Sequence, residues 1–333
     1  MKSSLSIVVS ATVLAALAAC GGGGGDSPSQ PGSDKVAITS ANQNQVVRAS
    51  VNAGLSVSMA QGRAGGASPA SVANRTHALG AVLQRAMTAA QGSRKGIASA
   101  TVRPSISASD TEPCGVSGSL TVSIDDRDAN NALSSGDVIS VSFAQCKDSA
   151  TSSINGAISI ALTSTPTATQ LTANANFQNV AVVEDGATST IAGNVAVAEN
   201  DTDLDTVTTL SVGSGGLTVS TASSGYNDSV SFASGFAILT DEATSGASTS
   251  VSLSGTMSAQ SLGGSITIST PQPLVQLSTD NYPSAGQVIV TGATGSAVRA
   301  TVLDNTQVRV ELDANGDGTY ESTSTVAWTT LIV

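Results

Sequence analysis

Apolar residues alternate with serine and threonine along most of the chain after residue 114. The alternation is clearest in four runs, at residues 138–143, 157–162, 265–269 and 308–312. Because successive side chains of a strand point to opposite faces of a sheet, this period of two predicts antiparallel strands with one buried and one solvated face. We therefore expect a mainly β fold over 114–333, as a large antiparallel sheet, a sandwich or a partly closed barrel of about a dozen strands.

Before this region the pattern favours one or two N-terminal helices. Apolar residues recur every fourth position within 38–61, at Val47, Val51, Leu55 and Met59. Residues 55–59 also alternate as a strand would, and we favour the helix. A second helix is expected over 69–91, with Ser68 as its cap, Pro69 in its first turn and Gly92 just past its end. Its apolar face predicts packing on the sheet. Residues 104–113, bounded by two prolines, are predicted to be a linker.

The first residues have the parts of a secretory signal. One positive charge at Lys2 precedes an apolar run over 5–16, which is too short for a permanent membrane helix of about twenty residues. The run closes with Leu17-Ala18-Ala19-Cys20, and five glycines follow. We therefore assign 1–19 to a signal peptide, and 20–35 to a flexible tether that begins with a modified cysteine.

Leu17-Ala18-Ala19-Cys20 resembles the lipobox of bacterial lipoproteins. The resemblance implies cleavage before Cys20, acylation of this cysteine with palmitate or a similar fatty acid, and a membrane partner through the lipid anchor. Gly21 stands where an aspartate would favour retention in the inner membrane, so the resemblance implies the outer membrane, on its periplasmic face or at the cell surface. The cysteine and polyglycine start, joined to an all-β body, is also similar to proteobacterial envelope lipoproteins of uncharacterised activity.

Charge is divided unevenly along the chain. Residues 35–103 contain eight basic residues and no acidic one, whereas 104–333 contain four basic and 22 acidic residues. The basic helical segment, 36–103, either faces an anionic membrane surface or docks on the acidic body of its own chain. Nucleic acid is excluded as a partner, because the β region is strongly acidic and aromatic residues make up only 2% of the chain.

Cys114 and Cys146 are expected to form a disulfide. They flank a predicted hairpin of strands 119–125 and 138–144, and Cys20 is assigned to lipid, so an exported chain leaves these two as a pair. The bond would stabilise the fold by about 3–4 kcal/mol in the chain-entropy account.

Residues 126–137, here called loop A, have the spacing of a calcium-binding loop. Oxygen side chains stand at positions 1, 3, 5, 9 and 12, and Leu133 takes the apolar position 8, which resembles the loop of EF-hand and dockerin proteins. Asn131 takes position 6, where glycine is usual, because asparagine also tolerates a left-handed turn. Asp137 replaces the usual bidentate glutamate. The predicted ligands are Asp126, Asp128, Asn130, Ala132 and Asp137.

Residues 313–321, here called loop B, match the calcium pattern DxNxDG. Position 12 is Ser324, so the missing carboxylate would come from position 9. The predicted ligands are Asp313, Asn315, Asp317, Thr319 and Glu321. For both loops the alternative is a solvated hairpin turn that needs no ion. The acidic cluster 200–205 lacks a glycine and a distal carboxylate, so we do not assign it an ion. His77, the only histidine, is interpreted as a solvated side chain.

These observations favour a non-enzymatic envelope module with structural calcium, which binds an envelope protein or a glycan. No nucleophile elbow, zinc-type histidine pair or phosphate-binding glycine loop is present. Two alternatives remain open: a periplasmic lipid or lipoprotein carrier with a half-open barrel, and a carboxylate-dependent hydrolase whose acidic pair is assembled by the fold.

Overall fold

The structure is a computed structural model that describes residues 34–57, 107–167, 169–184, 186–223 and 226–331. The lipobox with Cys20, the tether up to residue 33, the predicted helix over 69–91 and His77 lie outside the described residues.

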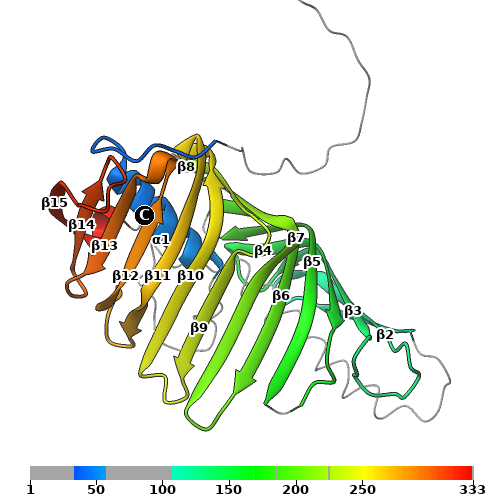
Figure 1. Ribbon diagram of the computed structural model, residues 1–333. Helices are drawn as coiled ribbons and strands as arrows, with labels where there is room; N and C mark the ends of the chain where they lie inside the picture. Colours follow the sequence, from blue (N-terminus) through cyan, green and yellow to red (C-terminus); the bar gives the residue numbers. More distant parts are fainter. Residues whose placement is uncertain (1–33, 58–106, 168, 185, 224–225, 332–333) are drawn as a thin grey trace, which may run out of the picture.

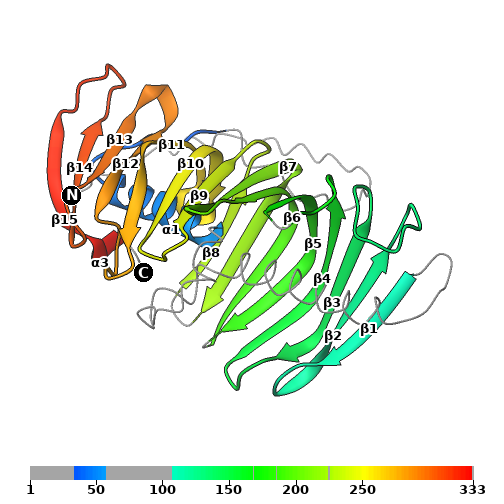
Figure 2. The ribbon, with the colours of Figure 1, turned by 90° about the horizontal axis from the view of Figure 1, so that it is seen from below.

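Fifteen strands form one antiparallel sheet (Figure 1), which confirms the predicted mainly β class and selects a single sheet over a sandwich. In chain order the strands are β1 (Ser107–Pro113), β2 (Ser117–Asp125), β3 (Val138–Lys147), β4 (Ser152–Leu162), β5 (Gln170–Glu184), β6 (Ala187–Asp201), β7 (Asp205–Ser223), β8 (Tyr226–Phe232), β9 (Ala237–Ala243), β10 (Ser248–Ala259), β11 (Gly264–Leu277), β12 (Ala285–Thr291), β13 (Ala297–Val302), β14 (Gln307–Asp313) and β15 (Ser322–Ala327). Nearly every strand pairs with its neighbour in the chain. Figure 2 shows how the sheet bends along its length.

One departure from this order lies in the middle of the sheet. The first part of β7 pairs with β9 and its last part pairs with β8, and both short strands pair in turn with β10. Strands β8 and β9 therefore lie end to end between two long strands.

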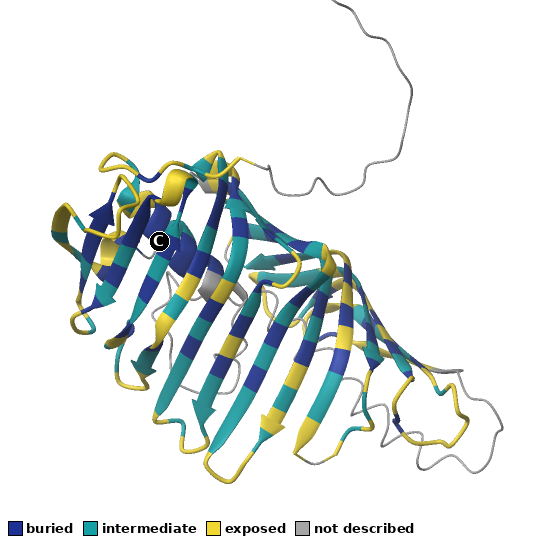
Figure 3. Ribbon diagram, in the orientation of Figure 1, coloured by how far each residue is buried: buried dark blue, intermediate teal, exposed yellow. Residues whose placement is uncertain are grey.

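The core is one face of this sheet (Figure 3). Apolar side chains occupy the same register in successive strands, so that Ile139 of β3 faces Ile124 on one side and Ile160 on the other. All three are buried. Between them, serine and threonine face the other side, as in the pair Ser123 and Ser140. The period of two in the sequence thus becomes an apolar face that extends from β2 to β14.

Helix α1 (Gln43–Val57) confirms the first predicted helix. It packs against β10, β12, β13 and β14 at one end of the sheet, with Val47 and Val51 fully buried. The chain before it is fixed to the sheet, because Val36 donates its N–H to Ser265 and accepts from the N–H of Ala293. Asp34 and Lys35, the last two residues of the predicted tether, already contact the sheet, because Asp34 accepts the N–H of Ser265 and Lys35 forms a bridge with the same residue.

The predicted linker at 104–113 is wrong for the described residues 107–113, which form β1. This strand pairs with β2 along its full length and is an edge of the sheet. Its described side chains are exposed, so they show no apolar alternation, and Pro113 stands at its end. Backbone pairing and one contact between the hydroxyls of Thr111 and Thr121 hold this strand, and neither leaves a signal in the apolar pattern.

A short helix, α3 (Trp328–Leu331), was not predicted. Trp328 is buried, donates its indole N–H to the carbonyl of Pro283 at 3.0 Å and stacks on Tyr282 with ring centroids 6.2 Å apart. The helix follows β15 directly and packs on α1, so it anchors the last strand from its C-terminal end.

Candidate metal centres

Loop A connects β2 to β3, and the pair Asp125 and Val138 closes its base. Carboxylate oxygens of Asp126, Asp128 and Asp137 lie within 4.8 Å of one another. Two predicted ligands from the beginning of the loop and one from its end are thus brought together, as the spacing predicts.

The loop is wound around its own side-chain oxygens. Asp126 accepts hydrogen bonds from the N–H groups of Asn130 (3.2 Å) and Asn131 (2.7 Å). Asn130 in turn accepts from the N–H of Ala132 at 2.6 Å. Ala129 and Asn131 are left-handed, with φ of 56° and 61°. The expected left-handed turn at position 6 is confirmed, whereas the one at Ala129 was not foreseen.

Asp137 closes the loop from its far end. Its side chain is fully buried and accepts the N–H of Arg127 at 3.0 Å and the N–H of Ser134 at 2.7 Å. Leu133 is also buried, as expected of the apolar position 8. The carboxylate thus joins both ends of the loop.

Two aspartates converge on one hydroxyl in loop A. Ser134 Oγ lies 2.9 Å from Asp128 Oδ2 and 3.1 Å from Asp137 Oδ2. A hydroxyl carries a single proton and satisfies only one of these oxygens at a time. The hydrogen bond from Ser134 is also the main cause that lowers the pKa of Asp128 below its ordinary value, so this carboxylate stays ionised beside its neighbours.

Loop B connects β14 to β15 and places the oxygens of Asp313, Asp317 and Glu321 within 4.8 Å of one another. Asp313 is buried and accepts from the N–H groups of Gly316 (2.7 Å) and Gly318 (2.9 Å). Further along, Asn315 accepts from the N–H of Asp317 and Asp317 accepts from the N–H of Thr319. The hydrogen bond from the backbone of Thr319 is the main cause that lowers the pKa of Asp317.

The two loops share one winding. Counted from the first aspartate of each, the residue at position 1 accepts the N–H of position 6, position 3 accepts that of position 5, and position 5 accepts that of position 7. Positions 4 and 6 are left-handed in both loops, as Ala129 and Asn131 in one and as Gly316 and Gly318 in the other.

The distal carboxylates also correspond. In loop A the N–H at position 2 donates to Asp137, and in loop B the N–H at position 2, that of Ala314, donates to Glu321. The position-9 residue of loop B thus takes the place that position 12 has in loop A, as its sequence suggested.

The donor set fits a hard cation. Both loops offer only oxygen: carboxylates, the side-chain amides of Asn130 and Asn315, and the carbonyls of Ala132 and Thr319 at position 7. Oxygen donors of this kind suit Ca²⁺, whereas zinc and copper favour nitrogen and sulfur. Carboxylates this close repel each other unless a cation or protons neutralise them.

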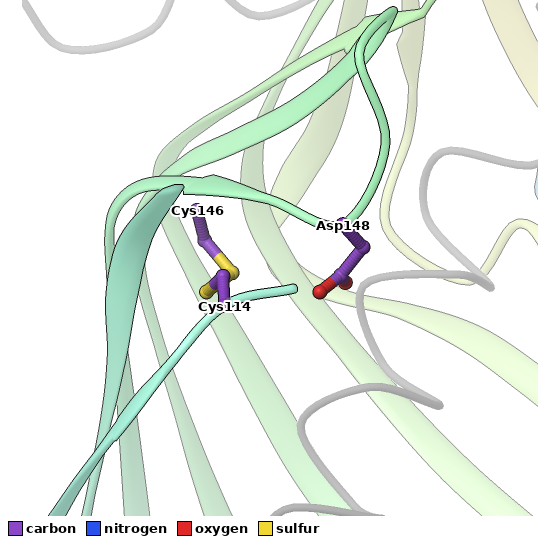
Figure 4. Close-up of side chains that lie close together, drawn as sticks. All are labelled: Cys114, Cys146 and Asp148. Carbon is purple, nitrogen blue, oxygen red and sulfur yellow. A yellow bond between two sulfur atoms is a disulfide. The ribbon is translucent and has the colours of Figure 1, made fainter. Parts of the chain in front are cut away.

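The predicted disulfide between Cys114 and Cys146 is present, with the two Cα atoms 5.4 Å apart (Figure 4). Asp148 lies close enough to both sulfurs for a metal site. The sulfurs are bonded to each other and offer no thiolate, and Asp148 accepts the N–H of Gly115 at 3.2 Å. We interpret the disulfide and Asp148 as a structural crosslink at the end of the β2–β3 hairpin, and not as a metal site.

The acidic cluster 200–205 forms the tight turn between β6 and β7. The N–H of Thr202 donates to the carbonyl of Asp205, and the hydroxyl of Thr202 contacts the side chain of Asp205. Leu204 at the tip is 80% exposed. The cluster thus lies in a turn whose tip is exposed to solvent.

No protein-family model matches this chain, and neither curated proteins nor solved structures gave a match. Among the described helices, none has the length and apolar character that a membrane crossing requires. The geometry of the two loops is therefore the main guide to what this protein does.

A network of charged side chains lies beside loop B and was not predicted from the sequence. Glu311 Oε2 accepts a hydrogen bond from Arg299 Nε at 2.9 Å, and Arg309 Nε forms an ion pair with the same oxygen at 3.3 Å. Arg299 also lies over the ring of Tyr320, 4.0 Å from its centroid. The hydrogen bond and charge of Arg299 lower the pKa of Glu311. Alternation along β13 and β14 places these residues on one face, but it does not reveal which strands are neighbours.

A small cavity of about 40 Å³ lies between α1 and strands β7 and β8. Asp228 lines it, is buried, and accepts hydrogen bonds from the N–H and the hydroxyl of Ser261. The volume suffices for a few water molecules and is well below the roughly 150 Å³ of a cavity that binds benzene.

Proposed function

We propose that this protein is a calcium-stabilised β module of the bacterial cell envelope, anchored in the outer membrane through a lipid on Cys20. In this proposal the protein is not an enzyme. Bound Ca²⁺ stabilises the fold, and the sheet and loops present a binding surface to an envelope protein or a glycan.

One observation carries the calcium part. Two loops that lie far apart in the sequence share the same winding, and each gathers three carboxylates within 4.8 Å. A single hairpin turn of this kind is readily explained without an ion. Two separate turns favour the same kind of ligand, because both have left-handed residues at positions 4 and 6 and a distal carboxylate that accepts the N–H of position 2.

Their places in the sheet suggest what the ion does. Loop A closes the hairpin next to the edge strand β1, and loop B closes the final hairpin at the opposite edge. The final hairpin has a neighbouring strand on one side only, and the hairpin of loop A lies one strand away from the other edge. Strands at or near an edge open most easily. Ions at these two loops would therefore stabilise the ends of the sheet.

The carboxylates of both loops favour a structural over a catalytic role. Asp126, Asp137, Asp313 and Glu321 each accept backbone N–H groups of their own loop. A hydrolase needs one carboxylic acid and one carboxylate facing a substrate cleft. The cavity beside Asp228, in turn, is too small to favour the carrier alternative.

Thermal unfolding with calcium and with chelator tests the calcium part. The chain from residue 26 onward keeps every described residue and serves as the sample. Calcium at a hundred times its dissociation constant should stabilise the fold by about 2.7 kcal/mol. Asp126→Asn and Asp313→Asn should each remove one site in a calorimetric titration, and Asp203→Asn, in the β6–β7 turn, is the matched control. An unchanged melting temperature at millimolar calcium would refute calcium binding.

The anchor has a separate test. Cells that express the whole chain are labelled with an alkyne-bearing palmitate analogue, and Cys20→Ser should abolish the label. Protease treatment of intact and permeabilised cells then distinguishes the cell surface from the periplasm. Labelling that persists in Cys20→Ser would contradict the anchor and leave the calcium result untouched.

A further inference from the structure

Strand β15 is an edge of the sheet with an unprotected backbone. It pairs with β14 along its whole length, and within the described residues no strand pairs with its other side. An edge strand offers a row of unpaired N–H and C=O groups to any strand that approaches it. Four of its six residues are exposed, so the rest of the described chain leaves it uncovered.

The opposite edge is protected. Strand β1 carries Asp110, Glu112 and Pro113, and natural sheets use such charges and prolines to prevent edge-to-edge pairing. Strand β15 has none of these features, since its sequence is Ser322, Thr323, Ser324, Thr325, Val326 and Ala327. One edge of the sheet is therefore protected against pairing with another strand, and the other edge is not.

Strand β15 is also held rigidly at both ends. Glu321 directly before it donates its N–H to Leu312 and accepts that of Ala314. Trp328 directly after it is buried and donates its N–H to Thr306. A strand fixed in this way loses little conformational entropy when another strand pairs with it.

We propose that β15 pairs antiparallel with β15 of a second copy of this chain and forms a two-fold symmetric dimer. Ser322, Ser324 and Val326 lie opposite the buried face of β14, so they mark the inner face of β15. A continuous sheet requires inner residues to face inner residues, which places the two-fold axis at Ser324 or at Thr325.

The unequal edges favour this partner. Pairing of β15 with β1 of another copy would repeat without end and form fibres, and the charges of β1 oppose it. Pairing of β15 with itself closes after two copies. The antiparallel arrangement also places the two acidic B loops at opposite ends of the interface, so they do not repel each other.

The dimer should be reversible. Six residues span about 20 Å, so the interface stays below the roughly 1,200 Å² of stable complexes. Sedimentation equilibrium of the chain with all described residues should therefore show the mass of one copy at about 1 µM and approach that of two copies towards 1 mM.

Two variants distinguish the interface from other contacts. Thr323→Lys with Thr325→Lys places exposed positive charges opposite one another across the axis and should reduce dimerisation at least tenfold. Ser109→Lys with Thr111→Lys at the β1 edge is the matched control and should dimerise like the wild type. The melting temperature of each variant checks that the fold is retained.

Cysteine substitution tests the register. Under mild oxidation, Ser324→Cys or Thr325→Cys should give a disulfide-linked dimer, because residues opposite each other in an antiparallel pair have Cα atoms about 4.5–5.5 Å apart. Thr111→Cys should not. A single-copy mass over the whole concentration range, or a dimer that the β15 lysines leave unchanged, would overturn the proposal.

Discussion

Glu321 Oε2 accepts a hydrogen bond from the backbone N–H of Ala314 at 3.0 Å and thereby closes loop B. We expect Glu321→Gln to weaken calcium binding at loop B at least tenfold, because it removes one of three clustered charges. Without calcium, loss of the charged acceptor should cost about 1 kcal/mol or less, because the side chain is exposed.

Calorimetric titration measures the first effect and urea unfolding with chelator the second. Glu112→Gln on β1 removes the same charge far from either loop and is the control. Equal calcium affinities of Glu321→Gln and wild type at two sites would show that Glu321 is no ligand.

Gly316 and Gly318 form a matched pair for the backbone of loop B. Both are left-handed, but a Cβ atom at Gly316 would come within 2.5 Å of the carbonyl oxygen of Thr294, whereas one at Gly318 meets nothing within 4 Å. Gly318→Ala should therefore cost about 1 kcal/mol from backbone strain alone. Gly316→Ala should cost more, since residues 293–295 must also shift. Urea unfolding of both variants tests this, and equal losses would contradict the role of the Thr294 contact.

The disulfide should contribute a large share of stability. Cys114→Ser with Cys146→Ser opens a link between residues 32 positions apart and should lower the free energy of unfolding by about 3–4 kcal/mol. Wild type in reductant should lose a similar amount. If the urea midpoint of the double variant equals that of the oxidised wild type, the bond stabilises the fold little.

The fold should lose stability in acid. Hydrogen bonds and the charge of Arg299 lower the pKa values of Asp128, Asp304, Asp317 and Glu311. A lowered pKa means that the folded state binds the proton less tightly than the unfolded chain. These groups therefore stabilise the fold above their ordinary pKa of about 4, and this contribution is lost as the pH falls through the lower folded values.

Glu311→Gln isolates one of these groups. It leaves Arg299 and Arg309 without their carboxylate and should cost about 1–3 kcal/mol at pH 7. Between pH 6 and pH 3 it should also lose less stability than wild type. Urea unfolding across this range measures both effects, and a wild-type stability that rises towards pH 3 would contradict the sign.

The strands and the two loops were predictable from sequence because their signals are local. Alternation fixes the buried face of β3 or β14, and the spacing of Asp126, Asp128 and Asp137 fixes which oxygens meet inside one turn. Cys114 and Cys146 were predictable because they flank the two strands of one hairpin.

Features that depend on contacts between different elements were not predictable from the sequence. Strand β1 is held mainly by its backbone and has no apolar alternation, so its sequence predicts a linker. The network around Glu311 depends on the register between β13 and β14. The four residues of α3 are too few to show helical periodicity. Trp328 and Leu331 are buried where the chain meets Tyr282 and α1, which are distant in sequence.

The strand order also has a consequence for how the chain assembles. Because most strands pair with the strand just before them, the sheet can grow hairpin by hairpin as successive segments become available. Helix α1 is the exception, since it comes before every strand in the chain yet packs on β10 and β12–β14. Its apolar face can be buried only after the last third of the chain, which contains these strands, has been synthesised. A chain that ends before β10 should therefore expose the apolar face of α1 and aggregate through this helix, and not through the early strands.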